Sequence, residues 1–317
     1  MGARTRRGFG ETEVVSDPAG CRWQVEEYSV ATEEGLYAWL GRDLYDLPDG
    51  WPRAQVVPWQ DAAALARHWD VALPAVAASA AFEVRLDLMQ EGSLLVGSEG
   101  QGAEEPDRSH LRRLHLQGAG EPLEPVLPAT SLAGVLRHRC LRIAQTLAGR
   151  GNGKACELVE WMFGPAEIRK GGPAWASRVA IKEARILGGR SLRHTRVRID
   201  PWTGGAVEGL LFTEDAHYGG SVAIEISLQE TDPEETQGAP ARALLLLALR
   251  DLACGDLNVG GEGGVGRGRW GPIEGRPFAT VAEPPVELYL EPDGTVRCEP
   301  PDVFEQDFAA LQRHLTS

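Results

Sequence analysis

Apolar and polar residues alternate along several stretches of the chain, a pattern that predicts strands with one buried face. The clearest are residues 81–90, AFEVRLDLMQ, and residues 221–228, SVAIEISL. Residues 177–187 predict a further strand, and residues 286–300 read as a hairpin around a DG turn. Another strand is expected directly after the glycine-rich stretch that ends near residue 271. The pattern therefore predicts a sheet with one covered face.

Two long stretches, residues 127–149 and residues 241–252, have the spacing of amphipathic or buried helices. The apolar stripe of the first consists of Leu132, Leu136, Ile143 and Leu147. Thr130 or Ser131 is its expected N-cap. Shorter helices are expected at residues 62–69 and at the C-terminus. The order strand, helix, strand, strand, helix, strand predicts an α+β protein with a ferredoxin-like (RRM-like) split βαβ core and long insertions.

Composition narrows the class of protein. Hydrophobic residues make up 43% and charged residues 25% of the 317 residues, which is ordinary for a globular chain. The longest apolar run, residues 243–249, is far shorter than the roughly 18 residues of a membrane span, and no signal peptide is recognisable. The five cysteines include no CxxC pair, which argues against a zinc ribbon or disulfide framework and fits a reduced cytosol. We expect a cytoplasmic protein without a membrane partner.

Charge is distributed unevenly. Residues 108–198 hold 17 Lys and Arg against 6 Asp and Glu, a net charge of +11. The rest of the chain holds 15 against 40, a net charge of −25, and the two parts give the overall −14. A basic middle within an acidic chain predicts a site for a polyanion on one face, although a solvated cluster of charges would give the same count.

A glycine-rich stretch, VGGEGGVGRGRWG at 259–271, contains a GxGxxG pattern. It follows a helix near the end of the chain, whereas a dinucleotide-binding loop follows a strand at the start of a βαβ unit. Residues 179–182, VAIK, precede it, which is the reverse of the order in kinases, and there is no P-loop GK[ST] or GxSxG elbow. Glycine backbone beside Arg267 and Arg269, together with the start of the helix at Thr130, instead suits a run of phosphates.

Four segments resemble the RAMP superfamily, the repeat-associated proteins that form the backbone of type III CRISPR effector complexes. LPATSLAGVLR at 127–137 looks like its IPGSSLKGALR helix start, and residues 259–270 resemble its C-terminal glycine-rich loop. WMFGP followed by ASRVAI is similar to its LFG…SRV passage, and residues 197–228 resemble the segment around its third core strand. The four occur in family order over about residues 80–275.

MGARTRRGFGE at the N-terminus resembles the same glycine loop. We therefore expect residues 1–79 to be the tail of a preceding RAMP-like unit, residues 80–280 the RAMP domain, and residues 281–317 a C-terminal hairpin and helix. The tail packs either on this chain or on a neighbouring subunit.

The resemblance implies a set of RNA-binding residues: Thr130, Ser131, Arg137, Arg139, Arg178, Arg193, Arg196, Gly260, Gly261, Gly266, Arg267 and Gly268. It also implies a thumb hairpin at residues 184–205 that wedges into the guide–target duplex. Three positions depart from the family pattern. Ala129 and Ala133 replace glycine and lysine, and Glu262 replaces a basic or polar residue, which weakens the positive field of the loop.

Asp107 occupies the position of the family's catalytic aspartate, in PDRSHLRR. The resemblance implies a metal-dependent endoribonuclease in which Asp107 accepts a proton or holds a transient Mg²⁺ or Mn²⁺. The implied partners are guide CRISPR RNA, complementary target RNA and other RAMP subunits of an antiviral complex. Two alternatives stay open: a non-catalytic RNA-binding scaffold, and a guide-processing nuclease that uses a histidine. His110 is expected at the surface.

Overall fold

The computed structural model describes residues 24–27, 31–41, 55–58, 80–99, 105–113, 123–149, 152–167, 174–230 and 236–316. A small unit lies within Thr12–Ala78. Its described part is a two-stranded antiparallel pair, β1 (Gln24–Glu27) and β2 (Gln55–Pro58), with helix α1 (Glu33–Gly41) between them in sequence. The N-terminal glycine loop and the helix expected at 62–69 lie outside the described residues.

The large unit is built on an antiparallel sheet whose centre is β3 (Ala80–Glu91) paired with β13 (Ser221–Glu230). Leu86, Leu88 and Ile224 alternate with exposed or half-exposed residues on these strands and are fully buried, as the period-two pattern predicts. The other strands of this sheet are β7 (Arg112–Arg113), β8 (Glu124–Leu127), β9 (Val179–Ile181), β10 (Ala184–Leu187), β14 (Arg269–Pro272), β15 (Ala279–Val281), β16 (Val286–Leu290) and β17 (Val296–Glu299).

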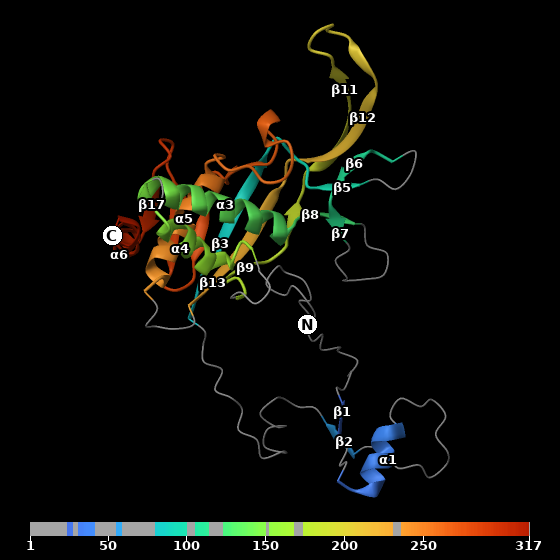
Figure 1. Cartoon of the computed structure of the whole chain (residues 1–317), viewed down its shortest axis with the longest axis vertical. Coiled ribbons are helices and arrows are strands. Elements are labelled where there is room, and N and C mark those ends of the chain that lie inside the picture. The colour runs from blue at the N-terminus through green and yellow to red at the C-terminus, as the bar shows by residue number, and fades with distance from the viewer. Residues whose placement is uncertain are drawn as a thin grey trace. The chain divides into compact units, whose positions relative to one another are not determined.

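Four helices cover one face of this sheet (Figure 1). They are α3 (Ala129–Ala148), α4 (Lys154–Phe163), α5 (Gly238–Ala253) and α6 (Glu305–Thr316). Helix α6 is tied to α5 by Arg242, whose guanidinium donates to both oxygens of Asp307 at 2.7 and 2.8 Å. The C-terminal hairpin and helix therefore join the core of the large unit.

A second sheet carries a long hairpin that projects from the helix-covered sheet (Figure 1). Its strands β11 (Arg190–Ile199) and β12 (Ala206–Tyr218) pair from Arg190 opposite Tyr218 to Ile199 opposite Ala206. β4 (Ser93–Leu94), β5 (Gly97–Glu99) and β6 (Arg108–His110) complete this sheet at the base of the hairpin. The expected hairpin exists, but it begins later than 184 and extends well past 205.

Several expectations need correction in detail. The single strand expected at 177–187 is two strands, β9 and β10, separated by Lys182 and Glu183. The apolar stripe of α3 runs through Leu132, Leu136, Cys140 and Ala144, while Leu147 is 50% exposed. Helix α4 was not expected. The chain is a mixed α+β protein whose sheets are antiparallel apart from the parallel pairing of β12 with β6, and no helix among its described residues is long and apolar enough to cross a membrane.

Candidate nucleic-acid interface

The start of helix α3 and the glycine loop after α5 line one groove, with a volume of about 640 Å³. Thr130 and Ser131 come from the first turn of the helix, and Gly260 and Gly261 come from the loop. The remaining lining residues are Val96, Gly97, Gly134, Val135, His138, Arg139, Arg142, Asp256, Leu257 and Asn258. Two segments that lie 130 residues apart in sequence therefore meet at one groove.

The helix start differs from the expected cap. α3 begins at Ala129 with Pro128 at the N-cap position, and no side chain caps it. Proline suits this place because it has no N–H to leave unpaired. Thr130 and Ser131 consequently lie inside the first turn. Their hydroxyl groups are not used as caps, and they line the groove instead.

Three cationic or titratable side chains follow Ser131 along the same face of α3. His138, Arg139 and Arg142 all line the groove. Part of the Arg139 guanidinium is engaged within the protein, because its Nε donates to Asp251 Oδ2 at 2.5 Å. Arg142 and His138 are exposed, and Arg142 has no ion pair with any described residue. The sequence-based set omitted both, although the spacing from Ser131 through His138 to Arg142 places them on one helical face.

The glycines of the loop are required chiefly by contacts within the protein. Gly268 has a φ of +74°, and a Cβ there would lie 1.9 Å from the carbonyl oxygen of Val259. Gly260 has a φ of +91°, and its Cβ would approach the carbonyl oxygen of Leu95 to 2.7 Å. The loop is thus folded tightly against itself and against the segment before β5. By contrast, Gly266 has open space around it and lies at the surface.

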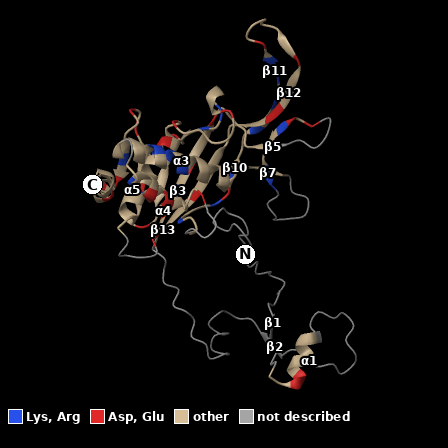
Figure 2. Ribbon diagram, in the orientation of Figure 1, with Lys and Arg blue, Asp and Glu red and all other residues tan. Residues whose placement is uncertain are grey.

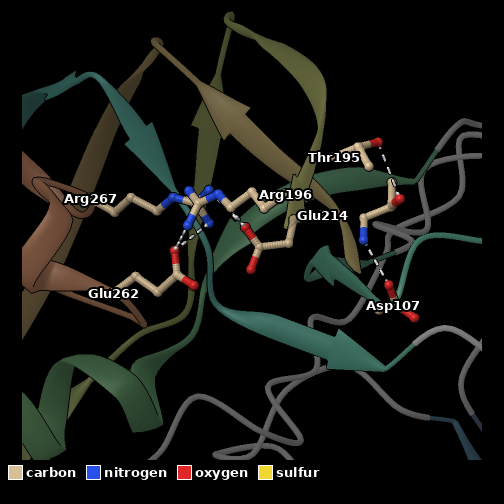
Figure 3. Close-up of polar contacts among 7 residues, drawn as sticks. Asp107, Thr195, Arg196, Glu214, Glu262 and Arg267 are labelled. Carbon is tan, nitrogen blue, oxygen red and sulfur yellow. Dashed lines mark hydrogen bonds and ion pairs between the residues drawn. The ribbon is translucent and has the colours of Figure 1, made fainter. Parts of the chain in front are cut away.

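Arg267 is oriented inward, which corrects its expected place on the RNA surface. It is 3% exposed, and its guanidinium contacts Glu214 at 2.9 Å and Glu262 at 3.2 Å (Figure 3). Arg196 of β11 contacts the same two carboxylates, at 3.5 Å from Glu214 and 2.8 Å from Glu262. Two of the predicted RNA-binding arginines are therefore neutralised by carboxylates within the protein.

Two more of the predicted arginines lie away from the groove. Arg137 donates to the carbonyl oxygen of Phe163 at 3.4 Å, and Arg178 stacks over the Trp161 ring at 4.3 Å. Both contacts are at the C-terminal end of α4. Arg193 lies on β11 opposite Asp215 and is exposed. Figure 2 shows blue ribbon segments, which mark Lys and Arg, on α3 and β11.

Asp107 lies at the base of the projecting hairpin, immediately before β6. Its Oδ2 accepts a hydrogen bond from the backbone N–H of Thr213 at 2.7 Å, and the residue is exposed (Figure 3). Oδ1 has no hydrogen-bond partner among the described residues. Two of the three nearby arginines in sequence are engaged elsewhere: Arg112 donates to Ser191, and Arg113 forms an ion pair with Glu183 at 2.9 Å. The third, Arg108, directly follows Asp107 and is exposed.

The surroundings of Asp107 bear on the expected divalent ion. Within the described ranges, no three His, Cys, Asp or Glu side chains are placed to hold a metal. A single exposed carboxylate oxygen fits an ion that takes its other ligands from water and a phosphate, which is how Mg²⁺ is often held in nucleic-acid enzymes. The residues present therefore fit a transient ion shared with substrate and do not form a closed metal site.

His110, expected at the surface, is buried. Its Nδ1 accepts the backbone N–H of Val96 at 3.2 Å, and its ring centroid lies 5.8 Å from that of His217. The pKa of His110 is lowered to about 4, chiefly because the imidazole is buried and also because His217 and Arg112 lie nearby. The imidazole is therefore neutral at physiological pH and belongs to the core beneath the hairpin.

A groove lined by a helix start, glycine backbone and cationic side chains is suited to a polyanion. Residues 113–270, just under half of the chain, match the model of the RAMP superfamily. The matched residues are similar to that family, and they include the helix start, the hairpin and the glycine loop. No curated protein matches the chain.

Proposed function

We propose that the protein is a guide-RNA-binding backbone subunit of a type III CRISPR effector complex, and that it cleaves the paired target RNA at Asp107. The observation that carries the proposal is the groove in which Thr130 and Ser131 face Gly260 and Gly261. A helix start and a glycine-rich loop on one surface provide consecutive backbone and hydroxyl donors for the phosphates of a strand.

The order of the central strands supports the same interpretation. β14, β3, β13 and the pair β10 and β9 lie side by side and antiparallel, with α3 between β3 and β9 in sequence and α5 between β13 and β14. We interpret this as a ferredoxin-like split βαβ unit into which the hairpin and the Asp107 segment are inserted. In this interpretation the insertions project from the edge of the RNA-binding unit.

The proposed cleavage uses the target's own 2′-hydroxyl. Its oxygen attacks the adjacent phosphorus while the bond from phosphorus to the 5′-oxygen breaks, leaving a 2′,3′-cyclic phosphate and a 5′-hydroxyl. Asp107 Oδ1 takes the proton of the attacking hydroxyl while water protonates the leaving oxygen. If a divalent ion binds, Asp107 would hold it instead, the ion would supply positive charge at the phosphate, and water would take the hydroxyl proton. The Thr213 N–H fixes the carboxylate through Oδ2 and leaves Oδ1 for this role.

The Asp107→Asn variant tests the catalytic part of the proposal. The amide oxygen can still accept the Thr213 N–H, so the local fold is kept while the base is removed. In the assembled complex we expect target cleavage to fall roughly 10²-fold or more, the usual scale for loss of a general base. Target affinity should stay within about twofold, because pairing and phosphate contacts supply it.

Three other results would redirect the assignment. Cleavage by Asp107→Asn at the wild-type rate makes the chain a non-catalytic scaffold and places the nuclease in another subunit. Cleavage of repeat RNA alone makes it a guide-processing enzyme, for which His138 in the groove is the histidine to substitute. Loss of cleavage in EDTA assigns Asp107 to metal binding, and retention assigns it to proton transfer.

A further inference from the structure

Four charged side chains form a closed ring beneath the hairpin (Figure 3). Arg196 and Glu214 come from β11 and β12, and Glu262 and Arg267 come from the glycine loop. Each arginine contacts both glutamates, at distances from 2.8 to 3.5 Å, so positive and negative groups alternate around the ring. We call these four residues the charge ring.

The charge ring is largely withdrawn from water. Glu214 and Arg267 are 1% and 3% exposed, while Arg196 and Glu262 close the ring on its outer side. Removing such charges from water is costly, and the cost is met only when every charge has well-placed partners. Here each charge has two oppositely charged neighbours, and two of the four contacts, Arg196 to Glu262 and Arg267 to Glu214, are also hydrogen bonds. Arg267 Nη1 makes no hydrogen bond among the described residues. If Arg196 or Glu262 alone loses its charge, an unbalanced charge is left beside the buried pair of Glu214 and Arg267.

The charge ring is also adjacent to the proposed catalytic carboxylate through one strand. Thr213, which donates to Asp107, is the residue before Glu214 on β12. Glu214 in turn pairs with Arg108 of β6, the residue after Asp107, in parallel register. The segment of β12 that contains Glu214 therefore contacts the Asp107 segment twice: Thr213 donates to the Asp107 side chain, and Glu214 pairs with the next residue, Arg108.

On its other side the charge ring belongs to the loop that lines the groove. Glu262 follows Gly261 directly and adopts a left-handed φ of 59°, which is uncommon for a residue with a side chain. Its carboxylate is thereby directed to Arg196 and Arg267. Glu262, which departs from the family pattern, therefore balances the charges of two arginines within the protein.

We propose that the charge ring is a positioning device that locks the hairpin base and the Asp107 segment to the glycine loop. Arg196 and Glu262 are positioning residues in this account, and neither contacts RNA. The expected effect of the charge ring on the cleavage rate rests on the proposed function. Its expected effect on the structure of the Asp107 segment does not. Its consequence is that neutralising Glu262 harms the site even though it makes the surface more basic.

The test compares Glu262→Gln with Glu274→Gln, an exposed glutamate in the turn after β14 and outside the ring. With saturating target we expect single-turnover cleavage by Glu262→Gln to fall roughly 10- to 100-fold, the scale for a misplaced catalytic group, while Glu274→Gln stays at the wild-type rate. Amide hydrogen exchange over residues 105–113 should accelerate in Glu262→Gln alone. The double variant Arg196→Gln/Glu262→Gln should recover part of both losses, because it restores charge balance.

Tighter RNA binding by Glu262→Gln with unchanged cleavage and exchange would overturn the inference, since Glu262 would then only repel RNA. Additive losses in the double variant with a weaker RNA affinity would also overturn it, because Arg196 would then be a phosphate contact. If the wild-type complex does not cleave, the proposed catalysis fails by itself. Exchange over residues 105–113 then decides the inference: acceleration in Glu262→Gln supports it, and unchanged exchange rejects it.

Discussion

At the scale of single residues, the chemistry of this chain depends on which charged side chains face outward. Arg267 and Arg142 are both arginines near the groove, but one is buried between two glutamates and the other is exposed. A sequence motif reports that an arginine is present without reporting its partner. Glu262 lies in the same loop, but the carboxylate of Glu214 comes from β12 and reaches Arg267 only through tertiary structure, so this inward orientation was not predictable from the loop alone.

The buried His110 gives a pH dependence of stability. Its pKa is lowered from 6.5 to about 4, so the unfolded chain binds this proton more readily than the folded one. The stabilising contribution is present above pH 6.5 and is lost as pH falls from 6.5 toward 4. Between pH 7 and pH 5 we expect a loss of about 2 kcal/mol of unfolding free energy from this residue.

Urea unfolding of wild type and His110→Asn at the two pH values measures this contribution. The variant is expected to be less stable at pH 7, because it alters a buried packing position, but its free energy should change less between pH 7 and pH 5. An equal pH response in the two proteins would show that His110 remains accessible to protons in the folded state.

At the scale of elements, the spacing of apolar residues predicted helices and strands most accurately where one face of the element is fully buried. The strands β3 and β13 and the helix α5 have continuous buried faces, and the sequence predicted each of them. Helix α4 was not expected, since its ten residues lie between glycines and short helices leave a weak pattern. The cap of α3 was also misplaced, because Pro128 fills the position without any side-chain hydrogen bond.

The β11–β12 hairpin carries an exposed apolar tip. Trp202 is 94% exposed, Ile199 61% and Leu210 40%, and all three lie near the turn between the two strands. Apolar wedges of this kind unstack bases at a cost of a few kcal/mol, offset by contacts to the bent strand. As the family resemblance implies, we predict that this tip separates bases of the guide–target duplex and sets the spacing of cleavage.

Replacing residues 198–210 with Asn-Gly removes the tip cleanly, because Val197 and Leu211 are paired and accept a two-residue turn. The charge ring is retained. Mapping of cleavage products should show loss of regularly spaced cuts, with guide binding intact. Cuts at the original positions would show that the tip has no wedge role.

At the scale of the whole molecule, the opposing net charges predict a salt-dependent RNA affinity. The basic middle of the sequence supplies α3 and β11, while the rest of the chain is acidic. Arg142 is exposed in the groove and unpaired with any described residue, so we assign it one phosphate contact. Arg142→Gln should weaken RNA binding for all sequences and reduce the slope of log affinity against log salt by roughly 0.7 to 0.9.

The matched control is Arg313→Gln, an exposed arginine on α6 outside the groove. It removes the same charge from the molecule, so any general effect of net charge appears in both variants. Equal slopes for Arg142→Gln and Arg313→Gln would mean that the groove gives no specific phosphate contact.

The central claim is that this chain functions on guide RNA within an assembly, and affinity purification of the tagged protein from its host, followed by sequencing of the bound RNA, tests it most directly. We predict small RNAs of uniform length that carry repeat sequence at one end, recovered together with other RAMP subunits. A protein that purifies without small RNA and without partner subunits would contradict the account.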